Sequence, residues 1–244
     1  MQTVYIDLPQ GKRLVWYLAA EEYFAKRLAE VSLDEEGVLF TWKVAPTVIF
    51  GRHQVMQNEV NVPFCHEHGI AMYRRKSGGG CVYADTGNLM ISYISASTHS
   101  EQVFQFYLDE MSALLREMGY PAVKSTHNDI MVQGSKVSGN ACFALPTGTI
   151  VHGTMLFDVD FEVLQQAITP AREKLAKHGV ESVRQRVCNL KELGEKGAFR
   201  TLDEFERVLV DACSQRRYTL TEQDRQAIDG IEEEYLDPGF ICSR

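Results

Sequence analysis

The segment at residues 74–83 combines positive charge with glycine: it reads Arg74-Arg75-Lys76-Ser77-Gly78-Gly79-Gly80-Cys81-Val82-Tyr83. Consecutive glycines let backbone N–H groups approach a ligand without interference from Cβ atoms, and successive N–H groups can form an anion-binding concavity. The three cations would add positive charge there. The segment matches neither the P-loop nor the Rossmann pattern. It predicts a cradle for a phosphate or a carboxylate; a turn beside a solvated basic patch is the alternative.

A second segment, residues 128–140, places a lysine directly after a turn. Asn128 and Asp129 open it, Gln133-Gly134-Ser135 looks like a hairpin turn, and Lys136 follows. A lysine ammonium is a compact charge with three donors, which suits it to stabilise charge at a phosphate when a rigid strand aims it. We therefore predict a catalytic role for Lys136; the alternative is an exposed hairpin lysine.

A third segment contains a single histidine, His152, within an apolar run. Such a histidine is commonly a hydrogen-bonded core residue. Gly153 beside it indicates that another group approaches the backbone closely.

The composition limits the classes of function. The chain has 244 residues, with 25 Lys and Arg against 33 Asp and Glu, a formal charge of −8. An acidic chain lacks the basic footprint of a general nucleic-acid binder, so an anionic ligand needs a local cluster of cations. The sequence has neither a membrane-spanning apolar stretch nor a secretory signal. Six cysteines without metal-ligand spacing indicate reduced thiols, no metal site and a cytoplasmic location.

Apolar periodicity predicts the elements that would position these segments. Helices are expected over residues 14–29, 101–118, 202–212 and 221–235, and strands over 38–42, 47–50, 71–75, 81–83, 88–94, 129–132, 136–143 and 149–157. Gly119 suits the end of the second helix, and Thr201-Leu202-Asp203-Glu204 resembles a capping box. The pattern predicts an α+β protein of mixed β-sheets flanked by helices. We expect a catalytic domain at 1–190 and a small helical tail or cap at 191–244.

Taken together, the three segments resemble the lipoate–protein ligase A family, within the wider group of biotin ligases and octanoyltransferases. The family pattern RRxSGGGxVxxDxGN is matched from Arg74 to Asn88, NDxxxxGxKxSGxA from Asn128 to Ala141, and HGTxL from His152 to Leu156. Weaker likeness extends to residues 18–22, 47–54 and 174–190. The resemblance covers about residues 15–190 and implies the biotin/lipoate-ligase-like catalytic fold.

The resemblance implies a two-step reaction. ATP, with Mg²⁺ as co-substrate, and lipoate would form lipoyl-AMP and release pyrophosphate. A lysine amine of an acceptor domain, from a 2-oxoacid dehydrogenase or a glycine-cleavage carrier protein, would then attack the mixed anhydride. No permanently bound cofactor is implied.

The family's site residues transfer to this chain by position. ATP would be bound by Arg75, Gly80, Cys81, Val82, Tyr83 and Lys136. Lipoate would be bound by Ser77, Gly78, Gly79, Lys136, His152 and Gly153. Asn88, Asn128 and Asp129 would position the acceptor lysine or a magnesium ion.

Two departures from the family leave other functions open. Ala84 precedes Asp85 where many relatives carry histidine, and only a short tail stands where many carry an accessory domain. A separate accessory polypeptide, sufficiency of the tail, or a partial ligase activity would each account for this. One rival is an ATP-independent octanoyl or lipoyl transferase between carrier proteins, although no cysteine lies between Cys81 and Cys142. Another is a non-catalytic lipoate-binding module, which the retained Arg75 and Lys136 disfavour.

Overall fold

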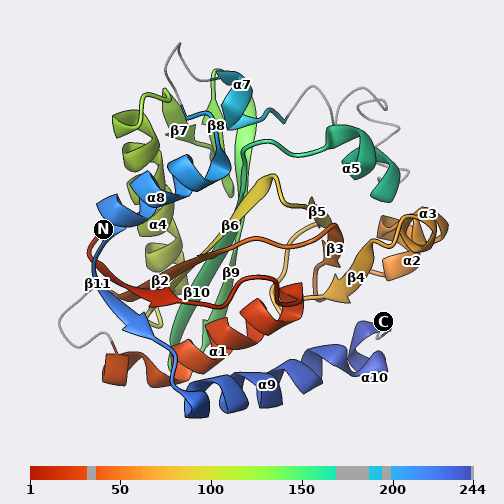
Figure 1. Cartoon of the computed structure of the whole chain (residues 1–244), viewed down its shortest axis with the longest axis horizontal. Coiled ribbons are helices and arrows are strands. Elements are labelled where there is room, and N and C mark those ends of the chain that lie inside the picture. Colours follow the sequence, from red (N-terminus) through yellow and green to blue (C-terminus); the bar gives the residue numbers. More distant parts are fainter. Residues whose placement is uncertain (32–36, 169–186, 194–198, 243–244) are drawn as a thin grey trace.

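The computed structural model describes residues 1–31, 37–168, 187–193 and 199–242 (Figure 1). The strands are β1 (Thr3–Asp7), β2 (Gly37–Trp42), β3 (Thr47–Phe50), β4 (Ala71–Arg74), β5 (Val82–Ala84), β6 (Asn88–Ser95), β7 (Ala122–Lys124), β8 (Asp129–Val132), β9 (Ser135–Leu145), β10 (Gly148–Leu156) and β11 (Ser214–Thr219). The helices are α1 (Leu14–Val31), α2 (Met56–Glu59), α3 (Val62–Glu67), α4 (Ser100–Glu117), α5 (Phe161–Ala167), α7 (Leu190–Leu193), α8 (Leu202–Cys213), α9 (Glu222–Leu236) and α10 (Pro238–Ile241).

These strands form two sheets. In the described residues the larger sheet has eight strands in the order β11-β1-β2-β6-β10-β9-β8-β7, and the smaller has three in the order β4-β3-β5. β1 pairs in parallel with β2 and β11, whereas β2, β6, β10, β9, β8 and β7 pair antiparallel. The α+β class with mixed sheets is confirmed.

Side chains of the central strands alternate between two cores, one on each face of the large sheet. Met90 and Ile94 of β6 pack in the core that contains α1 and part of α9. Leu89, Ile91 and Tyr93 pack in the core that contains α4 and α8. All of β6 is buried, because helices cover both faces. α1 and α9 lie side by side at the bottom of Figure 1.

The four predicted helices are present, and their ends show why they begin and stop there. α4 ends before Gly119, which has a φ of +91°, a conformation that glycine adopts without a Cβ penalty. Thr201 and Glu204 form the expected capping box at α8. The predicted turn between β8 and β9 is also present, with positive φ at Gln133 and Gly134.

Three strands and several short helices were not expected from the sequence. β1, β7 and β11 lie outside the predicted strands because their short runs mix polar and apolar residues, and the sheet supplies the partners that stabilise them. β11, in the segment expected to be helical, pairs with β1. The domain division at residue 190 stays a prediction. Most of the segment 174–190, which showed a weak likeness to the family, lies outside the described residues.

No helix in the described part of the chain is long and apolar enough to cross a membrane.

Candidate active site

A pocket of about 140 Å³ lies where the glycine segment meets β9 and β10. Its lining residues come from elements far apart in the sequence: Leu18, Trp42, Ile49, Arg75, Gly79, Gly80, Cys81, Val82, Met90, Asn128, Lys136, Gly139, Asn140, Ala141, His152, Gly153 and Thr154. The three segments singled out by sequence therefore meet at one place. Apolar side chains from α1, β2, β3 and β6 line the same pocket, and periodicity alone did not place them there.

Arg75, which lines the pocket, stabilises the conformation of the glycine loop (residues 77–80) by hydrogen bonds to its backbone. Its Nη2 donates to the carbonyl oxygens of Gly78 and Gly80, both at 2.7 Å, and Nη1 donates to Ile49 O at 3.3 Å. Gly79 has a φ of +94°, and a Cβ there would come within 2.8 Å of Arg75 Nη2. Burial lowers the pKa of Arg75 to about 10, so its guanidinium stays charged at neutral pH.

The other two cations of the segment do not line the pocket. Arg74 is 1% exposed and donates from Nη1 to the carbonyl oxygens of Arg52 and Gln54, both at 2.8 Å. Lys76 Nζ forms ion pairs with Glu22 and Glu234. The expected cluster of four cations around the ligand is therefore wrong: Arg75 and Lys136 line the pocket, while Arg74 and Lys76 support the loop.

The side chain of Lys136 reaches Asp129 across the β8–β9 hairpin, in which Lys136 itself pairs with Met131 and Asp129 with Gly139. The Nζ of Lys136 is 2.6 Å from Asp129 Oδ1, and the two side chains are 32% and 26% exposed. A Cβ at Gly139 would come within 2.7 Å of this Nζ, so the glycine provides the room that the lysine occupies. Cys188 N donates to Lys136 O at 3.0 Å and secures the backbone. The ammonium is thus held on a β-strand and, among the described residues, pairs with the carboxylate of Asp129.

Asn128 and Asn140 position the turn that carries Asp129. Asn128 Nδ2 donates to Asn140 O at 2.8 Å, and Asn140 Nδ2 donates to Asn128 O at 3.0 Å. A Cβ at Gly153 would come within 1.9 Å of Asn140 Oδ1. Gly153 therefore admits the Asn140 side chain, which explains the close approach expected at this glycine.

His152 belongs to a chain of polar contacts that begins in the core. Its Nδ1 is 2.8 Å from Glu21 Oε2, and its Nε2 is 2.9 Å from Ser77 Oγ. Ser92 Oγ donates to Glu21 Oε1 at 2.6 Å and accepts from Trp42 Nε1 at 2.9 Å. Because a carboxylate only accepts hydrogen bonds, His152 Nδ1 carries the proton of the Glu21 contact. Both ring nitrogens of His152 therefore have hydrogen-bond partners, as expected of a core histidine, and the residue also lines the pocket.

The predicted residues thus divide into three groups. Those that line the pocket are Arg75, Gly79, Gly80, Cys81, Val82, Asn128, Lys136, His152 and Gly153. Ser77, Gly78 and Asp129 contact lining residues. Tyr83 and Asn88 lie outside the lining, and both are buried. Glu21, Trp42 and Asn140 were not singled out by sequence, although residues 18–22 showed a weak likeness.

The second half of the glycine motif builds a turn. Asp85 N donates to Asn88 Oδ1 at 2.9 Å, Gly87 N donates to Asp85 Oδ1 at 2.8 Å, and Asp160 N donates to Asp85 Oδ2 at 3.0 Å. A Cβ at Gly87 would come within 2.0 Å of Asp158 O. Asp85, Gly87 and Asn88 therefore connect β5 and β6 to the chain after β10 and lie outside the pocket lining. Ala84, where many relatives have histidine, is fully buried.

The thiols near the pocket are poorly suited to attack an acyl group. Burial raises the pKa of Cys81 to about 12 and that of Cys142 to about 11. The thiolate is the nucleophilic form, so neither cysteine is activated at neutral pH. All six cysteines are free, as their spacing predicts.

The sequence is similar to a known protein family. A model of the lipoyl protein ligase A/B catalytic domain matches residues 15–214, which is most of the chain. The chain belongs to this family. The resemblance inferred from the three motifs is therefore confirmed.

Named relatives of this family member are lipoate ligases. It is 35% identical over 226 residues to lipoate-protein ligase LplJ of Bacillus subtilis, an alignment that covers 89% of this chain and 66% of that protein. The chain thus spans just under two thirds of the length of such curated relatives.

Solved structures support the fold of the lipoyl protein ligase family. A bi-partite lipoate protein ligase from Thermoplasma acidophilum, studied with its E2 lipoyl domain, superposes with a TM-score of 0.82 at 22% identity, covering 99% of this chain and 96% of that one. Lipoate-protein ligase A bound with ATP superposes with a TM-score of 0.81 at 22% identity, covering 98% of each chain. At these identities the likeness concerns the fold.

Proposed function

We propose that this chain is the catalytic part of a lipoate–protein ligase. The observation that carries the proposal is the composition of one pocket, where the apolar side chains of Leu18, Trp42 and Ile49 line the same cavity as Arg75 and Lys136. Such a lining suits an acid with an alkyl chain, whose carboxylate must meet a second anion. Family membership and the names of the relatives support lipoate as that acid.

The reaction begins with the union of two anions. A lipoate carboxylate oxygen attacks the α-phosphorus of ATP, the bond from that phosphorus to the β-phosphate bridging oxygen breaks, and pyrophosphate leaves. Lys136 would offset the repulsion between the anions and the charge that develops at phosphorus. The backbone N–H groups of the glycine loop, preshaped by Arg75, would contribute to the same stabilisation. ATP binding is supported by the ATP-bound structure of the same fold.

The second step is transfer to protein. The ε-amine of an acceptor lysine attacks the carbonyl carbon of lipoyl-AMP, and the C–N bond of the amide forms as the nitrogen gives up a proton to solvent. AMP leaves with the electrons of the broken C–O bond of the anhydride. Asn128 and Asp129, held beside Lys136 by the Asn128–Asn140 pair, are the residues proposed to position this amine. The bi-partite ligase studied with its E2 lipoyl domain supports a lipoyl domain as acceptor.

Magnesium is proposed to arrive with ATP. In the described residues, no group of three or more His, Cys, Asp or Glu side chains could hold a metal ion. Mg²⁺ commonly keeps several waters and binds one or two carboxylates together with substrate phosphates. Asp129 is the carboxylate of the candidate site that fits this arrangement. We further propose a cytoplasmic location and a separate accessory polypeptide, the latter supported by the bi-partite relative.

One assay distinguishes the ligase from its rivals. The protein is incubated with lipoate, Mg-ATP and an apo lipoyl domain, and both pyrophosphate release and acceptor mass are followed. ATP-dependent addition of a lipoyl group is expected. Addition that occurs only from an acylated carrier protein would instead identify a transferase, and ligand binding without either product would identify a binding module.

A further inference from the structure

Lys76 is enclosed by side chains of α1 and α9. Its Nζ lies 2.9 Å from Glu22 Oε1 on α1 and 2.8 Å from Glu234 Oε2 on α9. It also lies 4.5 Å from the ring centroid of Tyr235, within the range of a cation–π contact. Tyr235 OH in turn bonds to Glu22 Oε1. We call Glu22, Lys76, Glu234 and Tyr235 the lysine clamp.

The clamp is attached to the glycine loop through the backbone. Lys76 lies between Arg75, which bonds to the carbonyl oxygens of Gly78 and Gly80, and Ser77, which bonds to His152. Ser77 O also accepts from Arg52 N at 3.0 Å. Arg75 therefore holds the loop through hydrogen bonds to its carbonyl oxygens, and Lys76 connects the start of the loop to α1 and α9.

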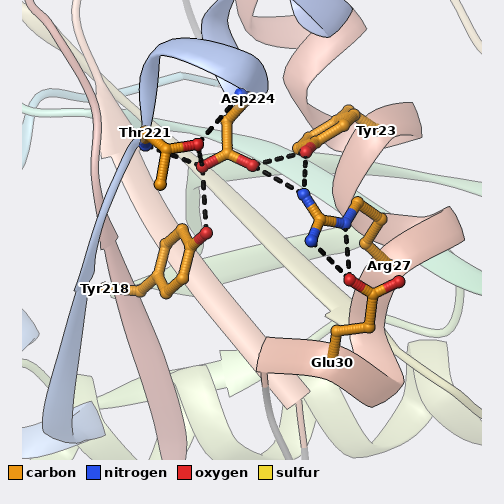
Figure 2. A network of polar contacts seen from close by, with 6 residues as sticks. All are labelled: Tyr23, Arg27, Glu30, Tyr218, Thr221 and Asp224. Carbon is orange, nitrogen blue, oxygen red and sulfur yellow. Dashed lines mark hydrogen bonds and ion pairs between the residues drawn. The ribbon is translucent and has the colours of Figure 1, made fainter.

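α9 is itself fixed along the whole length of α1. Near the start of α9, the carboxylate of Asp224 accepts from Tyr23, Arg27 and Tyr218 (Figure 2). Further along, Asp229 accepts from Trp16 Nε1 at 2.7 Å and Glu232 pairs with Arg13 at 3.1 Å. These successive polar contacts hold α9 against α1 and place its C-terminal end beside Lys76.

α10 contacts the residue before the pocket arginine. The Nε of Arg74 donates to Ile241 O of α10 at 3.1 Å, and its guanidinium lies 4.8 Å from the centroid of the Phe50 ring. Both residues that flank Arg75 are therefore in contact with the C-terminal helices.

We propose that Lys76 is a positioning residue: through the lysine clamp, the docked α9 keeps the glycine loop in the conformation that binds ligand. Lys76 is not a ligand of the phosphate or the carboxylate, because the carboxylates of Glu22 and Glu234 already pair with its ammonium and Lys76 does not line the pocket. The activity measurements that test this proposal rest on the proposed function. In this proposal, α9 is part of the structure that supports the binding site.

Lys76→Met tests the clamp with two readouts that need no substrate. The Arg52 amide reports the bond to Ser77 O, and the ¹⁵N shifts of the His152 ring report the contact with Ser77 Oγ. We expect amide exchange at Arg52 to accelerate about tenfold, because local opening of the loop becomes easier, and the His152 Nε2 shift to move. Lys76→Arg, which keeps the charge, should restore both values, and Glu234→Gln should give a smaller effect of the same sign.

Lys43→Met is the matched control. The Nζ of Lys43 also pairs with two carboxylates, Asp203 at 2.7 Å and Glu206 at 2.8 Å, and its side chain is 26% exposed against 19% for Lys76. The control should leave the Arg52 exchange rate and the His152 shifts unchanged. Equal effects of Lys43→Met and Lys76→Met, or a wild-type Arg52 rate in Lys76→Met, would overturn the proposal.

The activity arm separates this inference from the proposed function. If only about a tenth of Lys76→Met molecules have the competent loop, apparent KM values for ATP and lipoate should rise about tenfold with a nearly constant kcat. A change at Arg52 and His152 in a protein that makes no lipoyl-AMP, even with its accessory polypeptide present, would support the clamp and reject the ligase. Normal KM values in a variant with unchanged readouts would reject the clamp and leave the ligase standing.

Discussion

Lys136 and Asp129 form the ion pair around which the candidate site is arranged. The side chain of Lys136 is partly exposed and belongs to a rigid hairpin, so its ammonium can exchange one anionic partner for another without refolding. Gly139 leaves the space that this movement needs. Asp129 and Gly139 therefore serve to position the ammonium group of Lys136.

Removal of that charge should slow adenylation. For Lys136→Ala we expect the rate of lipoyl-AMP formation to fall by about a hundredfold or more, since one such donor contributes roughly 2.7–4 kcal/mol to the transition state. Pyrophosphate release in single turnovers measures it. Lys124→Ala is the control, because Lys124 is 34% exposed, pairs with Asp109 at 2.7 Å and lies outside the pocket lining. A wild-type rate in Lys136→Ala would exclude the role.

Two glycines should respond differently to a single added methyl group. In Gly139→Ala the new Cβ meets the flexible end of Lys136, so we expect a loss of adenylation rate of roughly tenfold to a hundredfold with little change in stability. In Gly87→Ala it meets the backbone oxygen of Asp158 at 2.0 Å, so unfolding should become easier by about 2–3 kcal/mol. Urea denaturation together with the rate assay checks both, and the opposite pattern would refute these assignments.

At the scale of elements, α9 joins the C-terminal segment to α1 through a buried carboxylate. The side chain of Asp224 is fully buried and lies 2.7 Å from Arg27 Nη1. Burial by itself raises the pKa of Asp224, but hydrogen bonds from Tyr23, Thr221 and Tyr218 outweigh it and lower the pKa to about 2. The Asp224 carboxylate, at the centre of the network in Figure 2, is therefore charged at neutral pH.

The contribution of the Asp224 carboxylate to the stability of the fold should decrease in acid. A carboxyl whose pKa is lower in the folded than in the unfolded chain stabilises the fold above the unfolded pKa of about 3.9 and loses that contribution as pH falls toward 2. The shift to about 2 corresponds to a contribution of about 2–3 kcal/mol. Asp224→Asn should lower the free energy of unfolding by about 2–4 kcal/mol at pH 7, with a smaller difference from wild type near pH 2.5.

Asp203→Asn is the control for this pH series. Asp203 is 84% exposed and pairs with Lys43 alone among the described contacts, and exposed pairs contribute about 0–1 kcal/mol. Urea denaturation across the pH range gives the comparison. A difference between wild type and Asp224→Asn that does not depend on pH would contradict the lowered pKa.

At the scale of the whole molecule, the proposed function requires an acidic chain to hold two anions in one place. The formal charge of −8 does not attract them, so Arg75 and Lys136, the cationic side chains among the described lining residues, and the backbone N–H groups of the glycines would do so locally. The pocket is lined by Leu18 of α1 and by residues of β9, and α9 packs against α1, so the C-terminal part of the described chain supports an element of the pocket.

The transfer half of the reaction should need only this pocket. Supplied with preformed lipoyl-AMP, the chain alone should modify an apo lipoyl domain without ATP, because the acceptor step requires the bound anhydride and its positioning groups. Acceptor mass is the measurement, and Lys124→Ala again serves as control. No modification by a folded chain that binds lipoyl-AMP would show that transfer requires a further polypeptide.

The sequence by itself determined the four long helices, most strands of the two sheets and nine pocket residues, because apolar periodicity, turn glycines and contiguous motifs are local properties of a chain. It could not determine β1 and β11, whose pairing depends on strands far away in the sequence. Nor could it determine the roles of Glu21, which contacts His152 from α1, and of Trp42, which is linked to Glu21 through Ser92. Arg74 and Lys76 show the same limit. Their charge is visible in the sequence, but only the tertiary structure places carbonyl oxygens, Glu22 and Glu234 around them, and those neighbours decide whether a cation binds ligand or supports a loop.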